Sequence, residues 1–389
     1  MESDFETHEG KHDLRAHGKS AGFLKDCSRA INRYSKLILK KFSDEKRYKK
    51  LQLLYYNKFF NKNNADALRG ISIDISGMCN LNCAMCSFQT WFDTKGLMSL
   101  ETFKKLSSAL RQVHWVSLQC NAEALLNPHI IECIKFAKSV NKNIGIAIVT
   151  NGTLLTPDLI SRLLEAGLGK ICISIDGATK KTYETIRKGA KFETVIENIK
   201  ELVKVRNSSK NNLKDIGIFT VISKLNMYEL PDILSLAGEL GLDSLSVNGC
   251  DVYNDEIKDK ELYVKSYGDL NVECEKIFST LINNAANCNI KLRLPSLWAV
   301  PYHSCEINNC IVSWNGDVSP CPLLSYERPY WYFGKKLMHP KIIFGNVNNN
   351  DLFDIWESKK FKKFRNDLRK GRLPRYCQKC LWQHKVLCG

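Results

Sequence analysis

Two hydrophobic periodicities alternate along residues 71–248. Short apolar runs rich in β-branched residues predict strands, and the stretches between them, with apolar positions every three to four residues, predict helices. The predicted strands are Ile71–Ser76, Val113–Gln119, Ile144–Thr150, Lys170–Ile175, Gly217–Ile222 and Ser244–Asn248. The predicted helices are Leu100–Arg111, Pro128–Val140, Pro157–Ala166, Lys180–Val205 and Tyr228–Leu240. Six strand–helix units predict an α/β fold with a helix-covered parallel sheet, and favour a partial barrel over a closed eight-stranded one.

The loop after the first predicted strand carries the most informative motif. Cys79, Cys83 and Cys86 lie within eight residues, in the spacing CxxxCxxC. Three thiolates on one short loop can hold three irons of a 4Fe-4S cluster, which leaves the fourth iron open to chemistry. A structural zinc site is the alternative, but it needs a fourth ligand, and no histidine lies between Ile71 and Trp91. The motif therefore favours a catalytic cluster.

This motif, its position after a strand and the pattern downstream resemble the radical S-adenosylmethionine (SAM) enzymes. The resemblance implies a partial (β/α)6 TIM barrel with the cluster loop at the C-terminal end of the sheet. It also implies that SAM binds the open iron and is cleaved by one electron to a 5′-deoxyadenosyl radical, which abstracts a hydrogen atom from the substrate. The expected cofactors are a SAM-binding 4Fe-4S cluster and S-adenosyl-L-methionine, and the expected partner is a reductant such as ferredoxin or flavodoxin.

Polar residues after the next predicted strands match further positions of this family. The family usually has Gly-Gly-Glu-Pro after its second strand, where Glu123 would help to hold the SAM amino group; this chain has Asn121 and Ala122 in place of the two glycines. The other matched residues would meet the adenine, ribose, methionine carboxylate or substrate, although turn or cap roles are the alternative. The residues assigned in this way to the cofactor site are Met85, Glu123, Asn151, Ser174 and Arg187.

A second group of cysteines lies near the C-terminal end. Cys310 and Cys321 flank an Asn-Gly turn, and Cys377 and Cys380 form a CxxC pair. With the intervening GDVSPC, GNV and DIW segments, this stretch resembles the SPASM/twitch extension of some radical SAM enzymes, which binds auxiliary 4Fe-4S clusters. We interpret these four cysteines as ligands of one auxiliary 4Fe-4S cluster. A four-sulfur zinc site is the rival interpretation, and Cys305 and Cys388 remain as spare candidates.

The positive charge of the chain belongs to its two ends. Residues 1–70 carry 16 Lys+Arg against 9 Asp+Glu, residues 357–389 carry 11 against 2, and the part between is balanced with 30 of each. Within the first segment, Ala30–Phe42 predicts an amphipathic basic helix. This helix could dock on the barrel, make peripheral contact with an anionic membrane surface, or bind an acidic partner. No sequence-reading motif indicates nucleic acid as the substrate.

Composition and cysteine usage suggest a cytoplasmic protein. The 389-residue chain is 44% apolar and 25% charged, and no apolar run predicts a signal peptide or a membrane span. Its 16 cysteines are therefore expected to be reduced thiols and metal ligands. We divide the chain into a basic helical N-terminal extension (1–70), a radical SAM core (71–250), a linker and substrate-pocket region (251–304) and a small auxiliary-cluster domain (305–389).

The expected reaction follows from the two predicted metal sites. Hydrogen abstraction followed by loss of a proton and an electron is a two-electron oxidation, and we expect dehydrogenation of a small hydroxylated metabolite. Radical cross-linking, oxidation or epimerisation of a peptide or protein is the first alternative, and a non-catalytic iron–sulfur or zinc binding protein is the second. After the sixth predicted strand, Cys250 could donate a hydrogen atom and Asp251 could accept a proton, whereas Tyr253 could wall the pocket or pack in the core.

Overall fold

The structure is a computed structural model of the chain, and it describes residues 67–90, 95–118, 121–208, 210–260, 262, 272–295, 307–332, 334–370 and 372–380. Residues 61–389 form one compact unit, to which everything below refers. The helix predicted at Ala30–Phe42 lies outside the described residues, as do Cys305 and Cys388.

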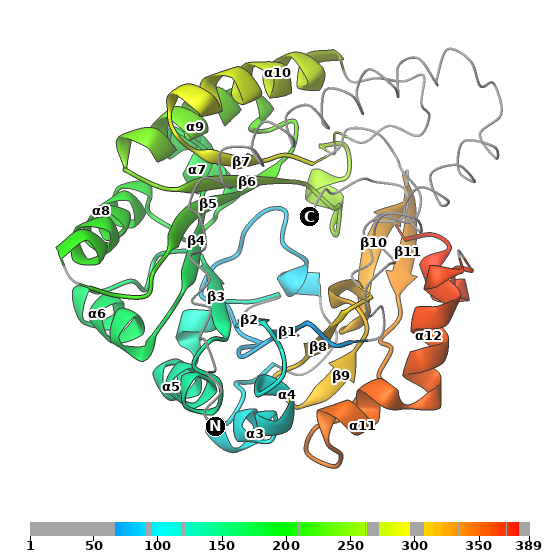
Figure 1. The fold of residues 1–389 in the computed structure, drawn as a ribbon. Coiled ribbons are helices and arrows are strands. Elements are labelled where there is room, and N and C mark those ends of the chain that lie inside the picture. Colours follow the sequence, from blue (N-terminus) through cyan, green and yellow to red (C-terminus); the bar gives the residue numbers. More distant parts are fainter. Residues whose placement is uncertain are drawn as a thin grey trace, which may run out of the picture. The chain divides into compact units, whose positions relative to one another are not determined.

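The six predicted strands form a parallel sheet in the order of the sequence. Ile71 of the first strand lies opposite Val116 of the second, and every further neighbour is also parallel. The strands are β1 (Gly70–Ile73), β2 (Trp115–Ser117), β3 (Gly145–Thr150), β4 (Lys170–Ser174), β5 (Asp215–Ile222) and β6 (Ser244–Gly249). Figure 1 shows the sheet curving, with helices along its outer side. The predicted α/β partial barrel is confirmed.

Two more parallel strands flank the predicted six. β7 (Lys291–Arg293) pairs with β6, and β8 (Asn309–Val312) pairs with β1. β9 (Asp317–Ser319) and β12 (Gly345–Asn346) then continue the same sheet with antiparallel pairing. The sheet therefore passes from the core into the segment predicted as the auxiliary domain. The domain boundaries drawn from the sequence stay a prediction.

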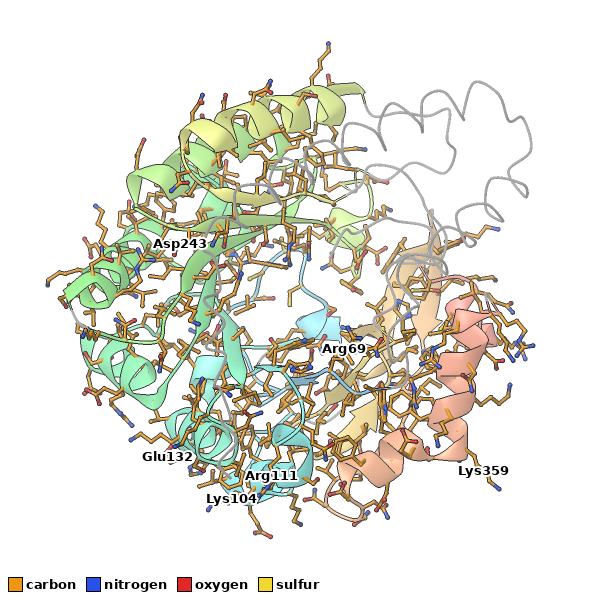
Figure 2. All side chains as sticks on the ribbon, in the orientation of Figure 1. Arg69, Lys104, Arg111, Glu132, Asp243 and Lys359 are labelled. Atoms are coloured by element: carbon orange, nitrogen blue, oxygen red, sulfur yellow. The ribbon has the colours of Figure 1, made fainter. Side chains whose placement is uncertain are left out.

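Eight helices accompany the core strands within the described residues. Figure 2 shows the charged side chains Lys104, Arg111 and Glu132 on their outer, exposed side. Helix α6 illustrates the local signals: Thr156 caps its start by accepting from the amide of Leu159 at 3.3 Å, and Gly167 ends it at φ +98°. The helices are α3 (Leu100–Lys104), α4 (Ser107–Leu110), α5 (Ile130–Val140), α6 (Pro157–Ala166), α7 (Lys180–Ile186), α8 (Phe192–Ser208), α9 (Leu230–Glu239) and α10 (Val272–Asn287).

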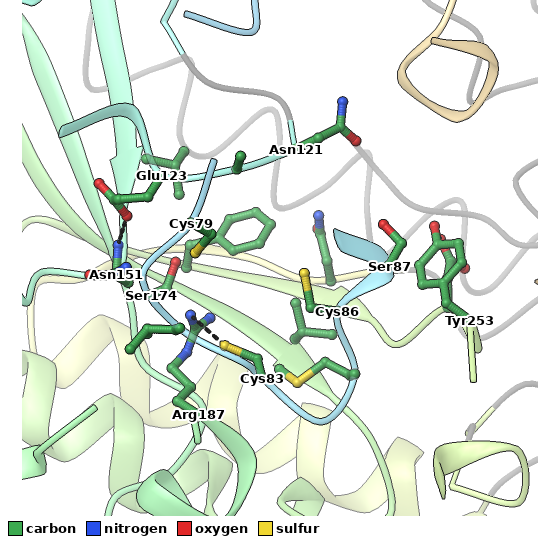
Figure 3. A pocket seen from close by; sticks show the side chains of 18 of the residues that line it. Cys79, Cys83, Cys86, Ser87, Asn121, Glu123, Asn151, Ser174, Arg187 and Tyr253 are labelled. Carbon is green, nitrogen blue, oxygen red and sulfur yellow. Dashed lines mark hydrogen bonds between the residues drawn. The ribbon is translucent and has the colours of Figure 1, made fainter. Parts of the chain in front are cut away.

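One break in a predicted helix bears directly on the site. The stretch predicted as a single helix at Lys180–Val205 forms α7 and α8, because Gly189 between them takes φ +98°. That left-handed conformation is available to glycine at little cost and interrupts the helix. Arg187 caps the end of α7, and its side chain turns toward the cysteine loop (Figure 3).

The C-terminal segment packs on the core through a shared hydrophobic cluster. It contains the hairpin β10 (Arg328–Tyr332) and β11 (Lys335–His339), then α11 (Leu352–Glu357) and α12 (Lys359–Arg369). Trp356 and Phe361 are buried in the same cluster as Ile71 of β1. The short 3-10 helices are η2 (Ser87–Thr90), η3 (Ala124–Leu126), η4 (Met227–Glu229), η5 (Asp255–Ile257), η6 (Pro322–Leu324) and η7 (Arg375–Cys377). Among the described helices, none is both long and apolar enough to span a bilayer.

Candidate functional site

A cavity of about 370 Å³ opens where the parallel strands end. Residues in or after each of the strands β1 to β6 contribute to its wall, and residues of the C-terminal segment complete it. The lining side chains include Met85, Asp251, Pro322, Leu323 and Arg328. Figure 3 labels ten others, namely Cys79, Cys83, Cys86, Ser87, Asn121, Glu123, Asn151, Ser174, Arg187 and Tyr253. Folds of this class place their chemistry at this edge of the sheet.

The cysteine loop is fixed to the end of α7 by backbone hydrogen bonds. The amide of Asn82 donates to the carbonyl of Lys188 at 3.0 Å, and the amide of Ala84 donates to the carbonyl of Ile186 at 2.8 Å. These bonds hold the loop between the sheet edge and α7, with all three predicted cluster cysteines lining the cavity. The structure therefore brings Cys79, Cys83 and Cys86 together.

The chemistry of this donor set fits an iron–sulfur cluster. Burial raises the pKa of Cys83 to about 12 and also raises the pKa of Cys79 and of Cys86. The thiols therefore stay protonated at neutral pH until metal displaces their protons. Within the described ranges, no three cysteine, histidine or acidic side chains converge on a single ion; thiolates of a cluster stand further apart, because each binds a different iron.

Glu123 is the buried anion of the cavity. Its Oε1 accepts hydrogen bonds from the Leu125 amide at 3.0 Å and the Thr150 hydroxyl at 2.7 Å, and its Oε2 accepts from the Asn151 amide at 2.8 Å. Burial raises the pKa of this carboxyl, and these donors oppose the rise. A carboxylate offers about four acceptor positions, so one position remains for a ligand in the cavity. The arrangement suits recognition of an ammonium group.

The remaining matched polar residues surround the same space. The side-chain amide of Asn151 donates to Asn80 of the cysteine loop at 2.8 Å, which joins the end of β3 to that loop. Ser174 is buried at the end of β4 and lines the cavity. Arg187 Nε pairs with Asp176 at 2.6 Å, and its Nη1 approaches Cys83 Sγ at 4.0 Å. The structure thus gathers all the predicted polar cofactor residues around one cavity.

The two residues proposed to serve the substrate occupy different surroundings. Asp251 lines the cavity, and its Oδ2 accepts a hydrogen bond from Tyr253 at 3.3 Å. Burial, followed by the Asp251 charge, raises the pKa of Tyr253 well above its usual value, so this phenol stays protonated. Cys250 is buried in an apolar cluster with Val252 and is not part of the cavity wall, so the structure does not bring it to the site. Met85 lines the cavity and packs against that cluster.

Three cavity residues were not anticipated from the sequence. Arg328 of β10, Ser87 of the cysteine loop and Asn121 after β2 all line the cavity, and Arg328 is hydrogen-bonded to the other two. The replacement of glycine by Asn121 was the one available signal. Nothing in the local pattern around Arg328 marks it as part of a site more than 200 residues away in sequence from Asn121.

The structure brings three of the four predicted auxiliary ligands together. Burial raises the pKa of Cys377, and the neighbouring Cys380 and Cys321 thiols add to the rise. Cys310 instead lies within β8, in register with Ile71 and fully buried. Burial raises the pKa of Cys310 to about 12, and the group that opposes the rise is the Arg365 guanidinium rather than another thiol. The structure thus places Cys310 inside the sheet, and its assignment as a cluster ligand stays a prediction.

Comparisons with known proteins match both parts of the chain. Residues 73–237 match the radical SAM superfamily, and residues 305–381 match the SPASM iron–sulfur cluster-binding domain. A tungsten-containing aldehyde ferredoxin oxidoreductase cofactor-modifying protein of Pyrococcus furiosus is 26% identical over 77% of this chain and 83% of its own length. A PqqA peptide cyclase of Bradyrhizobium diazoefficiens is 23% identical over 64% of this chain and 66% of its own length. An AdoMet-dependent heme synthase of Methanosarcina barkeri is 29% identical over 45% of this chain and 49% of its own length.

Solved structures share the fold at low sequence identity. Streptococcus suis SuiB bound to S-adenosylmethionine aligns with a TM-score of 0.58 and 18% identity, over 90% of this chain and 80% of its own. The structure of anSMEcpe with bound AdoMet and Cp18Cys peptide aligns with a TM-score of 0.55 and 19% identity, over 80% of this chain and 86% of its own. These two likenesses establish a common architecture for the barrel and the extension.

Proposed function

Because this chain is an enzyme of the radical SAM superfamily with a SPASM-type extension, we propose that it modifies a peptide or protein substrate by hydrogen-atom abstraction. The carrying observation is one cavity whose wall combines the cysteine loop and Glu123 with Asp251, Tyr253 and residues of the extension. The cysteine loop and Glu123 suit SAM, and Asp251 and Tyr253 present polar groups to a substrate. When bound, the clusters and SAM supply the hydrogen-abstracting radical and an acceptor for a second electron.

The chain's own residues have the following proposed roles. Cys79, Cys83 and Cys86 hold the cluster, and Glu123 accepts the SAM amino group while Thr150 and the Asn151 amide fix its carboxylate. Arg187, held by Asp176, faces the cysteine loop and offers its guanidinium to the methionine carboxylate. Met85 provides the apolar contact for the adenine, and Ser174 provides a hydroxyl for the ribose. These assignments derive from position and chemistry.

Asp251 is the proposed proton acceptor on the substrate side. An oxidation that begins with loss of a hydrogen atom must also lose one proton and one electron, and a carboxylate in the cavity wall can take the proton. Tyr253 holds Asp251 through its hydroxyl. Pro322 and Leu323 of the extension add apolar surface to the cavity wall.

The proposed auxiliary site uses Cys321, Cys377 and Cys380. The Cys380 and Cys321 thiols both raise the pKa of Cys377, which supports this grouping. A closed 4Fe-4S site takes four thiolates, so we assign the fourth to Cys305 or Cys388 instead of Cys310.

We place a peptide ahead of the hydroxylated metabolite expected from the sequence. The relatives named above include a PqqA peptide cyclase, and another relative is a mycofactocin maturase of Mycobacterium tuberculosis. A second candidate is modification of a cofactor, which is favoured by the Pyrococcus furiosus relative because it covers 77% of this chain.

The test is turnover by anaerobically reconstituted protein with dithionite and SAM, beside a Cys83→Ala control. Three substrate arms are compared: random-sequence synthetic peptides, a precursor of a tungsten-containing oxidoreductase cofactor and an aminosugar alcohol. We expect 5′-deoxyadenosine release that only the peptide arm accelerates, with a peptide product lighter by two hydrogens. Acceleration only by the precursor or the sugar would overturn the peptide proposal. Equal release from wild type and Cys83→Ala would overturn the assignment of the cluster loop.

A further inference from the structure

The buried side chain of Arg328 joins three segments of the cavity wall. Its Nη1 donates to Ser87 Oγ at 2.9 Å and to Asn121 Oδ1 at 3.2 Å, and its Nη2 donates to the carbonyl of Pro322. The residue is only 1% exposed, although it enters from β10 of the extension. Such a planar fork of donors can hold several acceptors in fixed directions, which the single ammonium of lysine cannot do.

Each acceptor lies beside a proposed cofactor ligand. Ser87 directly follows Cys86, Asn121 lies two residues before Glu123, and Pro322 directly follows Cys321. One guanidinium therefore touches the loop of the SAM cluster, the loop that carries the ammonium-binding carboxylate, and the segment that carries an auxiliary ligand.

Asn121 is itself held in the orientation that Arg328 requires. Its backbone amide donates to Asp74 Oδ1 and its side-chain amide donates to Asp74 Oδ2, both at 2.8 Å. The two bonds to one carboxylate at the end of β1 aim the Asn121 side-chain carbonyl at Arg328. Glycine, the residue usual here in the resembling family, has no side-chain amide to donate to Asp74 or to accept from Arg328. Asn121 therefore makes side-chain hydrogen bonds to Asp74 and Arg328 that glycine could not make.

We propose that Arg328 is a positioning residue that couples the extension to the SAM site, by fixing the cysteine loop and the Glu123 loop against the segment after Cys321. This inference rests on the proposed SAM site. The buried positive charge of Arg328 also lies beside the cysteine loop. It therefore favours the reduced form of a cluster bound there, because that form is the more negative one.

Two substitutions separate the charge from the geometry. Arg328→Lys keeps the charge and loses the fork, so we expect about tenfold weaker SAM binding with little change in the midpoint potential of the SAM cluster. Arg328→Met loses both, so we expect weaker SAM binding and a more negative potential. The potential is read by an EPR-monitored redox titration, and SAM affinity by equilibrium dialysis of the oxidised holoenzyme, which does not cleave SAM.

The matched control is Arg365→Met. Arg365 is also a fully buried arginine of the extension, but it donates to the carbonyl of Trp356 at 2.7 Å and does not line the cavity. We expect it to leave both readouts unchanged. Should Arg328→Met fail to fold with iron bound, Asn121→Ala keeps the charge and removes one acceptor, and it is expected to weaken SAM binding.

Coupling is tested by combining Arg328→Met with Cys321→Ala. If Arg328 transmits the effect of the extension to the SAM site, Cys321→Ala alone should weaken SAM binding. In the Arg328→Met protein, where this connection is already lost, Cys321→Ala should weaken SAM binding no further. Fully additive effects would overturn the coupling, and unchanged SAM affinity in both Arg328 variants and in Asn121→Ala would overturn the positioning role. Failure of the proposed SAM site is distinct, because wild type itself would then show no SAM-dependent change in its cluster signal, and failure of the peptide proposal would appear only in the substrate arms above.

Discussion

Arg187 and Asp176 form a buried ion pair beneath the cysteine loop, with 2.6 Å between Nε and Oδ2. The Asp176 side chain is fully buried, and the same arginine approaches Cys83. Removing one partner of a buried pair leaves an uncompensated charge. We expect Asp176→Asn to lower the free energy of unfolding by about 3–5 kcal/mol, measured by urea denaturation. The control is Asp158→Asn, which breaks an exposed pair with Arg162, and equal effects of the two substitutions would contradict this prediction.

Glu123 should determine SAM affinity. Glu123→Ala removes the acceptor proposed for the SAM amino group, and we expect binding to weaken at least tenfold, as for loss of a charge-assisted hydrogen bond. Equilibrium dialysis of the reconstituted protein measures this. Glu132→Ala on the exposed side of α5 is the matched control. Full SAM affinity in Glu123→Ala would rule out the assigned role.

The sequence predicts the core of this fold and much of the site because parallel strands leave a continuous apolar signal. Residues at the carboxyl ends of neighbouring strands must meet at one edge, so Glu123, Asn151 and Ser174 could be expected near the cysteine loop. The structure gathers them there. The helix break beside Arg187 was not predicted, because it depends on the left-handed conformation of Gly189.

Contacts between distant segments were beyond such inference. Arg328 reaches Ser87 across 241 residues, and no local pattern encodes that contact. Cys310 is ambiguous because a cysteine suits an apolar strand as well as a metal site, and its role as a ligand stays a prediction. The pairing of β8 with β1 that buries it joins the core to a segment that the sequence suggested was a separate domain.

The auxiliary ligands can be counted by iron analysis. Substituting Cys321, Cys377 or Cys380 by alanine should each remove about four irons per chain, the content of one cluster, whereas Cys310→Ala should keep them. Between Cys305→Ala and Cys388→Ala, we expect one to lose the cluster and the other to retain it. Iron and sulfide are assayed after anaerobic reconstitution, together with zinc. Loss of iron in Cys310→Ala, or zinc in the site, would contradict the proposed ligand set.

His339 should make the folded state sensitive to acid. The ring is 2% exposed and stacks on Tyr330 at 3.7 Å, and burial, followed by Arg328, lowers the pKa of His339 to about 3. In the unfolded chain the His339 imidazole takes up a proton near pH 6.5, whereas in the folded chain it stays neutral down to about pH 3. Stability therefore falls as pH drops from about 6.5 toward 3. We expect this residue to contribute a loss of about 1.4 kcal/mol per pH unit.

His339→Phe keeps an aromatic stack and removes the titration, so its unfolding free energy should fall less steeply below pH 6.5. Urea denaturation at a series of pH values measures the slope. His114→Phe, at an exposed position, should retain the wild-type slope. If the slope for His339→Phe equalled that of wild type, His339 would not be the source of the acid sensitivity.

Asp251 provides the clearest separation between SAM cleavage and substrate oxidation. Asp251→Asn keeps the shape of the side chain and its contact with Tyr253, but it removes the proposed proton acceptor. We expect 5′-deoxyadenosine still to form, while the rate of oxidised product falls about a hundredfold or more, as is usual when a general base is lost. SAM affinity should change little, because Asp251 is not among the residues that we assign to SAM binding. Asp255→Asn, on the exposed η5, is the matched control. An equal fall in both products would instead mean that Asp251 acts on the SAM site, and an unchanged product rate would exclude it as the proton acceptor.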